Sequence, residues 1–192
     1  WDPTASVLIR EKQATPEDLG DNSVGYTVST KASVSALGVY SEQATDSNET
    51  LSYSFSKVKG QWRISRLSDG IVLSRNSFED TFHEYPVYFF DPDYRYLVPD
   101  VRWFPTGSTV PSRIVAALVA GPSDWLQGGV VSTAFPAGVK VGSPIVIHNN
   151  TATVDLSADA ASTKNMVRAR MVNQLQLSLA GDEITDVALT AH

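Results

Sequence analysis

Hydrophobic and polar residues alternate with a period of two along much of the first 75 residues. Such alternation is typical of strands that bury one face of a sheet. Lys59-Gly60 separates two alternating runs and predicts a hairpin turn. The apolar positions of the predicted strands are Val24, Tyr26, Val28, Leu51, Tyr53, Phe55, Trp62 and Ile64. No stretch of this half predicts a helix, so we expect it to form an antiparallel meander.

Two polar stretches of the same half are expected to lie outside the strands. Thr45–Thr50 (TDSNET) is rich in turn-forming residues and predicts a polar turn. Arg10–Gly25 contains Pro16 and Gly20 and predicts a loop. A one-sided sheet needs a cover, and none is predicted here. The start at Trp1, without Met, favours an excerpt of a longer protein that has lost preceding helices.

Helical spacing of apolar residues occurs in the second half. A helix is predicted to start after Thr109, whose hydroxyl would cap it, and to end at Gly121-Pro122. Pro111 in the first turn supports this start. The other predicted elements are strands over Val130–Phe135, Ile145–Ile147 and Ala152–Leu156, a turn at His148-Asn149-Asn150, a helix from about Ser162 to Leu179, and a strand over Ile184–Leu189. This order predicts a small α+β domain.

Aromatic residues concentrate between Phe78 and Phe104. Strands are predicted over Tyr85–Asp91 and Leu97–Pro105, on either side of a turn at Asp91-Pro92-Asp93. The rings could stack on a ligand or partner, or they could fill a core and a domain seam. Arg102 could join such a surface, bind an anion, or pair with Asp100 inside the sheet. The candidate contact residues are Tyr88, Phe90, Tyr94, Tyr96, Arg102, Trp103 and Trp125.

Composition narrows the class of protein. Hydrophobic residues make up 42% of the chain and charged residues 19%, a globular composition. The net charge of −6 argues against a nucleic-acid partner, because phosphate-binding surfaces are basic. The sequence has no cysteine, which excludes disulfides, cysteine-ligated zinc and thiol catalysis. No apolar run approaches the roughly 20 residues that span a bilayer.

The glycine- and proline-rich stretch Leu118–Val141 raises the question of a phosphate-binding loop. Such a loop needs Gly-x-x-x-x-Gly-Lys-Ser/Thr directly after a strand. Here Gly121 follows a predicted helix, and Gly128-Gly129 comes without a lysine. We therefore expect these glycines to allow tight turns at the ends of helices and strands rather than to form a binding motif.

No catalytic or metal-binding constellation stands out. The histidines His83, His148 and His192 are far apart and have no ligand partners at helical spacing. Asp91 and Asp93 could hold calcium, but they lack a longer series of ligands. The remaining candidates for acid–base chemistry are Glu79, Asp80, Lys31, Glu42 and Lys57. The sequence therefore predicts a protein that is not an enzyme and that needs no cofactor or metal.

Four ordered motifs resemble the GerMN domain family, which takes its name from spore germination and sporulation proteins. These motifs are Leu118–Pro122, Pro136–Gly138, Val154–Leu156, and the helix from about Ser162 to Leu179. The resemblance covers roughly residues 84–192. It implies a small α+β domain, and it carries over no catalytic residues.

The preceding part is similar to the actinobacterial LpqB lipoprotein family in WDPTASV, in Gln61–Phe78 and in Tyr88–Pro105. The resemblance implies that residues 1–80 are the sheet-rich remainder of a nuclear-transport-factor-two-like domain and that residues 81–192 are the GerMN domain. It also implies a lipid anchor before this chain, at the extracytoplasmic face of the cell membrane, and a β-propeller after it. The implied partner is the extracytoplasmic domain of the sensor histidine kinase MtrB. The resemblance implies that this contact influences signalling in envelope homeostasis and division.

Three classes of function remain open from the sequence. A regulatory interaction module would expose a protein-binding patch. A binder of cell-wall glycan or peptide would need a pocket with converging polar groups. An enzyme would need a buried acid or base inside the first domain.

Overall fold

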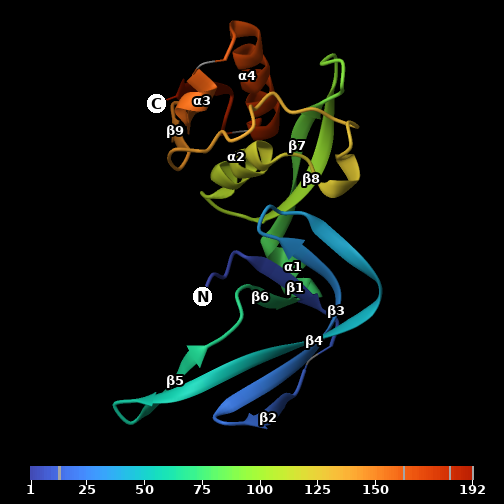
Figure 1. Ribbon diagram of the computed structural model, residues 1–192, viewed down its shortest axis with the longest axis vertical. Helices are drawn as coiled ribbons and strands as arrows, with labels where there is room; N and C mark the ends of the chain where they lie inside the picture. The colour runs from blue at the N-terminus through green and yellow to red at the C-terminus, as the bar shows by residue number, and fades with distance from the viewer. Residues whose placement is uncertain (13, 162, 182, 192) are drawn as a thin grey trace. The chain divides into compact units, whose positions relative to one another are not determined.

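The chain divides into two structural units, Trp1–Phe82 and His83–His192, each of which is described by itself (Figure 1). The computed structural model describes residues 1–12, 14–161, 163–181 and 183–191. Both units mix strands and helices, so the fold class is α+β as predicted. Within the described ranges, no helix has the length and apolar character that a membrane span requires.

The first unit is built on a six-stranded sheet. Its strand order is β5-β4-β3-β1-β6, and β2 also pairs with β3. All pairs are antiparallel except β1 and β6, which run parallel. The strands are β1 (Ser6–Arg10), β2 (Pro16–Gly20), β3 (Ser23–Ser35), β4 (Tyr40–Val58), β5 (Gln61–Arg66) and β6 (Ile71–Ser74).

The predicted turn at Thr45–Thr50 and the predicted loop at Arg10–Gly25 are wrong. β4 runs without interruption through the polar segment, because its backbone pairs along most of the long β3. The hydroxyl groups of Thr27 and Thr50 lie 2.8 Å apart across the strands, which suits a polar, exposed face. The segment expected to be a loop contains β2 and parts of β1 and β3. Backbone pairing therefore outweighs the turn propensity of single residues.

The turn at Lys59-Gly60 is confirmed. Both residues have positive φ, 52° and 80°, as the tight turns that join antiparallel strands require. Gly60 adopts this conformation without strain. The turn joins β4 to β5, with Val58 opposite Gln61.

One face of this sheet packs under the short helix α1 (Arg75–Thr81). Ser74 caps α1 by accepting a hydrogen bond from the backbone N–H of Ser77 at 3.2 Å. The Phe78 ring on α1 stacks on Phe82, with 4.9 Å between ring centres. The buried apolar residues of β1 and β3 are Val7, Ile9, Val28, Ala32 and Val34.

The second unit holds a two-stranded hairpin, a three-stranded sheet and the longer helices. The hairpin is β7 (Phe82–Phe90) with β8 (Leu97–Pro105), as the sequence predicts within a few residues. In the sheet, β10 lies between β9 and β11, antiparallel to β9 and parallel to β11. The remaining bounds are α2 (Val110–Ala120), η1 (Asp124–Leu126), β9 (Val146–His148), β10 (Thr151–Leu156), α3 (Ala158–Ala161), α4 (Asn165–Leu179) and β11 (Asp186–Ala191).

Three predictions in this unit need correction or comment. Val130–Phe135 is not a strand, and Ser132 alone bridges to Phe90. Thr109 precedes α2, but its side chain makes no capping bond. The predicted start of the last helix, Ser162, lies outside the described residues, and α4 begins at Asn165.

Two buried polar side chains of α4, Gln174 and Ser178, accept hydrogen bonds from backbone N–H groups of other segments. The Gln174 side-chain oxygen accepts the backbone N–H of Ala134 at 2.9 Å. Ser178 accepts the backbone N–H of Tyr88 at the same distance. A side-chain acceptor therefore satisfies the buried N–H group of Ala134 outside any strand, and another satisfies the partly buried N–H group of Tyr88 on β7.

Candidate functional site

The seven candidate contact residues do not form one surface. β8 alternates its side chains between its two faces, so Arg102 points inward while Trp103 lies half-buried on the opposite face. Phe90 is also buried. Phe90 and Arg102 are thus corrected from surface to core residues. Tyr88 is half-buried on β7.

Arg102 belongs to a buried hydrogen-bonded network. Its guanidinium donates to the Asp100 carboxylate at 2.7 Å and to the Gly121 carbonyl at 3.1 Å, and the side chains of both ion-pair partners are 1% exposed. The same carboxylate accepts the backbone N–H and the hydroxyl of Ser123, each at 2.8 Å. The network fastens the end of α2 to β8, which is a structural role.

The backbone conformation of the glycine-rich stretch shows what its glycines do. Gly121 has φ of 100° at the end of α2, and its N–H donates to the Ala117 carbonyl. Gly138 also has positive φ, 85°, in the turn before Val139. Both glycines occur where the chain changes direction, so they serve geometry, as the sequence predicts.

The tip of the β7–β8 hairpin is organised by Asp91. One oxygen of its carboxylate accepts the backbone N–H groups of Arg95 and Tyr96, at 2.6 and 2.7 Å. The hydrogen bond from Tyr96, with help from Arg95, holds the pKa of Asp91 below its usual range. Asp93 pairs with the Arg95 guanidinium at 3.2 Å. The two carboxylates therefore have partners in the turn, which makes calcium unnecessary to explain them.

Tyr94 sits at the centre of this tip in a left-handed conformation, with φ of 59°. Its ring lies 5.3 Å from that of Phe90, between ring centres. The Tyr94 ring also contacts α4. The guanidinium carbon of Arg170 lies 3.9 Å from the centre of the ring, a cation–π arrangement. Tyr96, two residues after Tyr94, is 73% exposed. We call Tyr94, Tyr96 and Arg170 the aromatic tip.

Trp125 occupies a separate element of the second unit. It lies on η1 and is 68% exposed, whereas its neighbour Leu126 is buried. Trp125 is thus placed on the surface as a single exposed aromatic residue, without a described contact to the aromatic tip.

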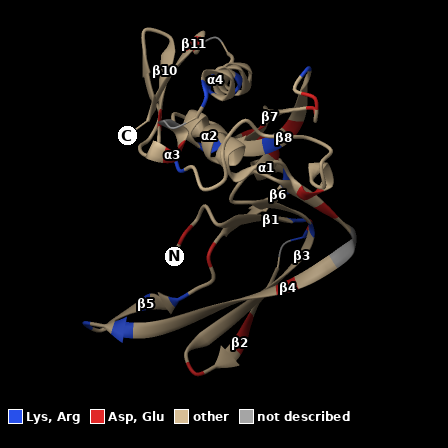
Figure 2. Cartoon of the chain, turned by 45° about the horizontal axis from the view of Figure 1, so that its top comes forward, with Lys and Arg blue, Asp and Glu red and all other residues tan. Residues whose placement is uncertain are grey.

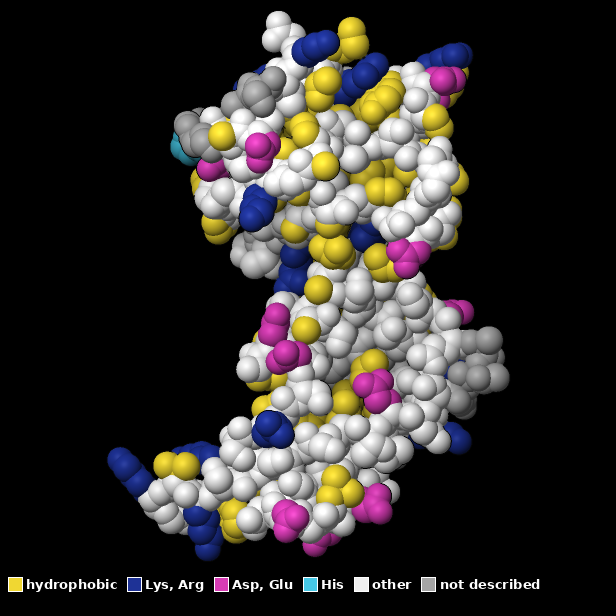
Figure 3. Space-filling view, viewed as in Figure 1, with side chains coloured by type: hydrophobic (Ala, Val, Ile, Leu, Met, Phe, Trp, Pro, Cys, Tyr) yellow, Lys and Arg dark blue, Asp and Glu magenta, His cyan; other side chains and the backbone are white. Residues whose placement is uncertain are grey.

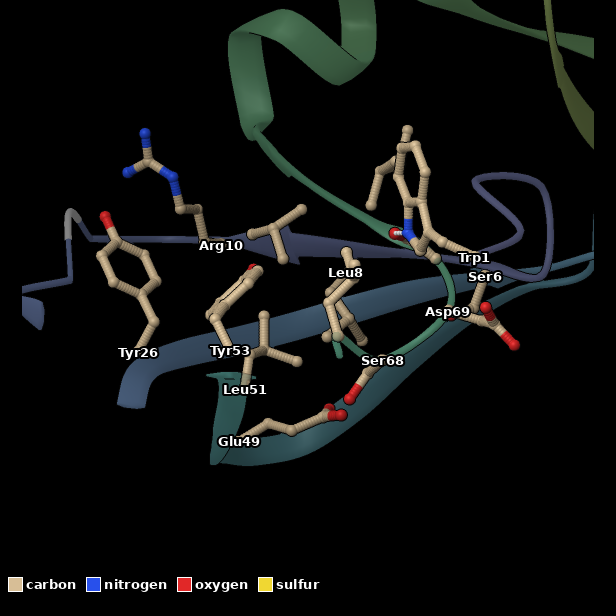
Figure 4. A pocket seen from close by; sticks show the side chains of 14 residues that line it. Trp1, Ser6, Leu8, Arg10, Tyr26, Glu49, Leu51, Tyr53, Ser68 and Asp69 are labelled. Atoms are coloured by element: carbon tan, nitrogen blue, oxygen red, sulfur yellow. Dashed lines mark hydrogen bonds between the residues drawn. The ribbon is translucent and has the colours of Figure 1, made fainter. Parts of the chain in front are cut away.

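The first unit contains a hollow of about 450 Å³, and the set of residues that line it was not predicted from the sequence. Figure 4 shows Leu8, Leu51 and Tyr53 along its middle. Arg10 and Tyr26 lie toward one end, and Trp1, Ser6 and Asp69 toward the other (Figure 4). The Trp1 indole N–H donates to the Gly70 carbonyl at 3.1 Å, which holds the ring at the rim. The lining residues come from segments that are distant in sequence. The only local signal for the hollow is the placement of Tyr26 and Tyr53 at alternating apolar positions of β3 and β4.

The other polar candidates are not brought together. His83 and His148 are exposed, and His192 lies outside the described residues. Glu79 pairs with Arg75 across one helical turn at 3.9 Å. Across the described part of the chain, no three His, Asp or Glu side chains could hold a metal ion together. The candidates Lys31, Glu42, Lys57, Glu79 and Asp80 are all exposed.

Both units match known protein families. Residues 1–79 match the family described as "Lipoprotein LpqB, N-terminal domain", and residues 86–192 match Germane, described as "Sporulation and spore germination". Lipoprotein LpqB from Cutibacterium acnes is 32% identical over 188 residues, covering 94% of this chain and 30% of the relative. Lipoprotein LpqB from Corynebacterium jeikeium is 38% identical over 154 residues, covering 77% of this chain and 24% of the relative.

The chain spans less than a third of the length of these curated relatives. Among solved structures, it is similar to the first GerMN domain of the sporulation protein GerM from Bacillus subtilis. That match has a TM-score of 0.46 and 18% identity, and it covers 57% of this chain and 83% of the solved chain.

Proposed function

The chain belongs to the Germane domain family and carries the domain pair of the LpqB lipoproteins, and on this premise we propose that it is a non-enzymatic accessory module outside the cytoplasmic membrane. In this proposal a lipid anchor outside this chain holds it at the extracytoplasmic face. It binds the extracytoplasmic domain of the sensor histidine kinase MtrB and modulates signalling in envelope homeostasis and division.

The aromatic tip is the observation that favours a protein-binding role. Tyrosine and arginine are among the residue types enriched at energetic hot spots of protein interfaces. Here Asp91 fixes the turn through the N–H groups of Arg95 and Tyr96, and Arg170 supports the Tyr94 ring from α4. Tyr96 therefore stands on a preorganised loop, which lowers the entropy lost on binding.

The polar side chains of the described residues support a role in binding rather than catalysis. A catalytic acid or base is commonly held in a site where burial or neighbouring charges match its pKa to the reaction. The buried carboxylate of Asp100 is instead engaged by Arg102 and Ser123. We therefore assign the chain no reaction, cofactor or metal.

Substitution of Tyr96 tests the proposed contact. Tyr96→Ala should weaken binding to the purified kinase domain at least tenfold, measured by titration calorimetry. Val146→Ala is the control, because it truncates an exposed apolar side chain of the second unit that belongs to neither proposed contact surface. Equal affinities for Tyr96→Ala and the unsubstituted chain would remove the aromatic tip from the proposal.

The hollow of the first unit favours a second candidate function, the binding of a cell-wall glycan or peptide fragment. Its volume is within the range of small-molecule sites, and it combines Tyr26 and Tyr53 with the guanidinium of Arg10. Aromatic faces suit sugar rings, and a guanidinium suits a carboxylate. N-acetylmuramyl dipeptide is a suitable probe. Saturable binding that Tyr53→Ala abolishes would support this function, and no binding would exclude it for this probe.

A further inference from the structure

The hairpin formed by the end of β4 and by β5 has an unusual surface. Every residue from Ser56 to Arg66 is exposed, so this segment contributes nothing to a core. Figure 1 shows the hairpin extending from the six-stranded sheet of the first unit. Its conformation is nevertheless regular, with paired strands and the tight turn at Lys59-Gly60.

Positive charge is concentrated in this hairpin. The segment from Lys57 to Arg66 contains four basic residues and no acidic residue, although the chain carries a net charge of −6. The four are Lys57, Lys59, Arg63 and Arg66. Figure 2 colours parts of this hairpin blue for Lys and Arg, and Figure 3 shows Lys and Arg side chains gathered at the same end of the first unit. An anionic surface would therefore be attracted here despite the overall negative charge.

The two faces of the hairpin differ in polarity. Phe55 is opposite Ile64, and Lys57 is opposite Trp62, so these side chains share one face. The other face carries Ser56 opposite Arg63 and Val58 opposite Gln61, so it is more polar but also holds one exposed apolar side chain. Trp62 and Ile64 are 53% and 51% exposed, although neither type is favoured in water at such exposure.

Lys57 adds a detail that fits an interface between water and an apolar phase. Its Nζ lies 5.1 Å from the centre of the Trp62 ring, so its methylene stem runs along the apolar face while its charge stays at the ring. Tryptophan is enriched where headgroups meet acyl chains, because one part of its ring system is apolar and its N–H is polar.

We propose that the hairpin Lys57–Arg66 docks on an anionic phospholipid surface. Trp62 and Ile64 enter the headgroup region, and Lys57 on the same face and Lys59 in the turn contact lipid phosphates. Each basic residue near such a surface contributes about 1 kcal/mol, so Lys57 and Lys59 together strengthen a membrane attachment that a single lipid chain makes only weakly. The inference rests on the proposed location at the membrane. It does not depend on kinase binding, because the contact is made to lipid alone.

Vesicle co-sedimentation of the purified chain tests the inference without the kinase. Vesicles of phosphatidylglycerol and phosphatidylcholine in equal parts should bind the chain, and pure phosphatidylcholine should not. Raising the salt concentration should weaken binding, because exposed charges are screened. The double substitution Lys57→Gln with Lys59→Gln should weaken binding about 30-fold, from two losses of about 1 kcal/mol each. Trp62→Ser should weaken it as well.

The matched control is Lys31→Gln with Lys140→Gln, which makes the same charge change at exposed lysines elsewhere. The control should bind like the unsubstituted chain. No binding to anionic vesicles, or equal weakening in the control, would overturn the inference. If vesicles fail to bind but the hairpin variants lose kinase binding, the hairpin is a protein contact instead. Circular dichroism of each variant shows whether its fold is retained.

Discussion

The guanidinium carbon of Arg170 lies 3.9 Å from the centre of the Tyr94 ring, which joins α4 to the tip of the β7–β8 hairpin. The two residues are far apart in sequence, and the contact holds the loop that presents Tyr96. Arg170 is only half-exposed, so the interaction is partly shielded from water. The aromatic tip is therefore a tertiary feature of the second unit rather than an isolated exposed turn.

Removal of this contact should cost a small, measurable amount of stability. Arg170→Ala should lower the free energy of unfolding by about 0.5–2 kcal/mol, the range from exposed to desolvated cation–π pairs. Urea denaturation measures the change. In a double-mutant cycle with Tyr94→Asn, which retains a residue that tolerates positive φ, Arg170→Ala should have almost no further effect once Tyr94 is replaced. Full additivity would mean that the two side chains do not interact.

The buried pair of Asp100 and Arg102 should be far more sensitive. Asp100→Ala leaves the guanidinium without its carboxylate at 1% exposure, and we expect a loss of about 3–5 kcal/mol. Ser123→Ala removes one hydroxyl donor to the same carboxylate and should cost about 1 kcal/mol. Chemical denaturation of both variants gives the comparison. A smaller loss for Asp100→Ala than for Ser123→Ala would contradict the network described above.

Two glycines with positive φ should respond differently to alanine. Gly60 has φ of 80° and open space around it, so Gly60→Ala should cost about 1–2 kcal/mol from backbone strain alone. At Gly70, with φ of 97°, an added Cβ would lie 2.7 Å from the Ser6 carbonyl oxygen. Gly70→Ala must therefore also disturb the start of β1 and the contact with Trp1. The melting temperature of Gly70→Ala should be clearly lower than that of Gly60→Ala. The reverse order would contradict the close approach of Gly70 to Ser6.

The turn at the aromatic tip should loosen in acid. The carboxylate of Asp91 accepts two backbone N–H groups, and these bonds lower its pKa in the folded chain. A lowered pKa means that the turn is fully stabilised above the unfolded pKa of Asp and loses that stabilisation as the pH falls through the folded pKa. The amide resonances of Arg95 and Tyr96 should shift together in that window. In Asp91→Asn the acid-dependent shift should disappear.

Some of the fold is readable from the sequence because local rules and tertiary structure agree. The hairpin turn at Lys59-Gly60 and the strands β7 and β8 follow from turn chemistry and from apolar alternation. The glycine at the end of α2 follows from the need for positive φ there. In each case a single segment contains the whole signal.

Other features depend on partners that no local pattern reveals. Thr45–Thr50 lies within a strand because β3 supplies a partner for its backbone. Val130–Phe135 does not form a strand, and Gln174 on α4 rather than a neighbouring strand accepts one of its buried N–H groups. Arg102 and Trp103 are adjacent in sequence but face opposite sides of β8. The hollow of the first unit likewise requires the tertiary arrangement of several strands.

Titration of this chain with the purified extracytoplasmic domain of the sensor kinase tests the central proposal most directly. We expect saturable one-to-one binding with measurable heat, and co-elution of the two proteins in size-exclusion chromatography. Absence of both heat and co-elution, with each protein folded, would contradict a regulatory interface in these two units.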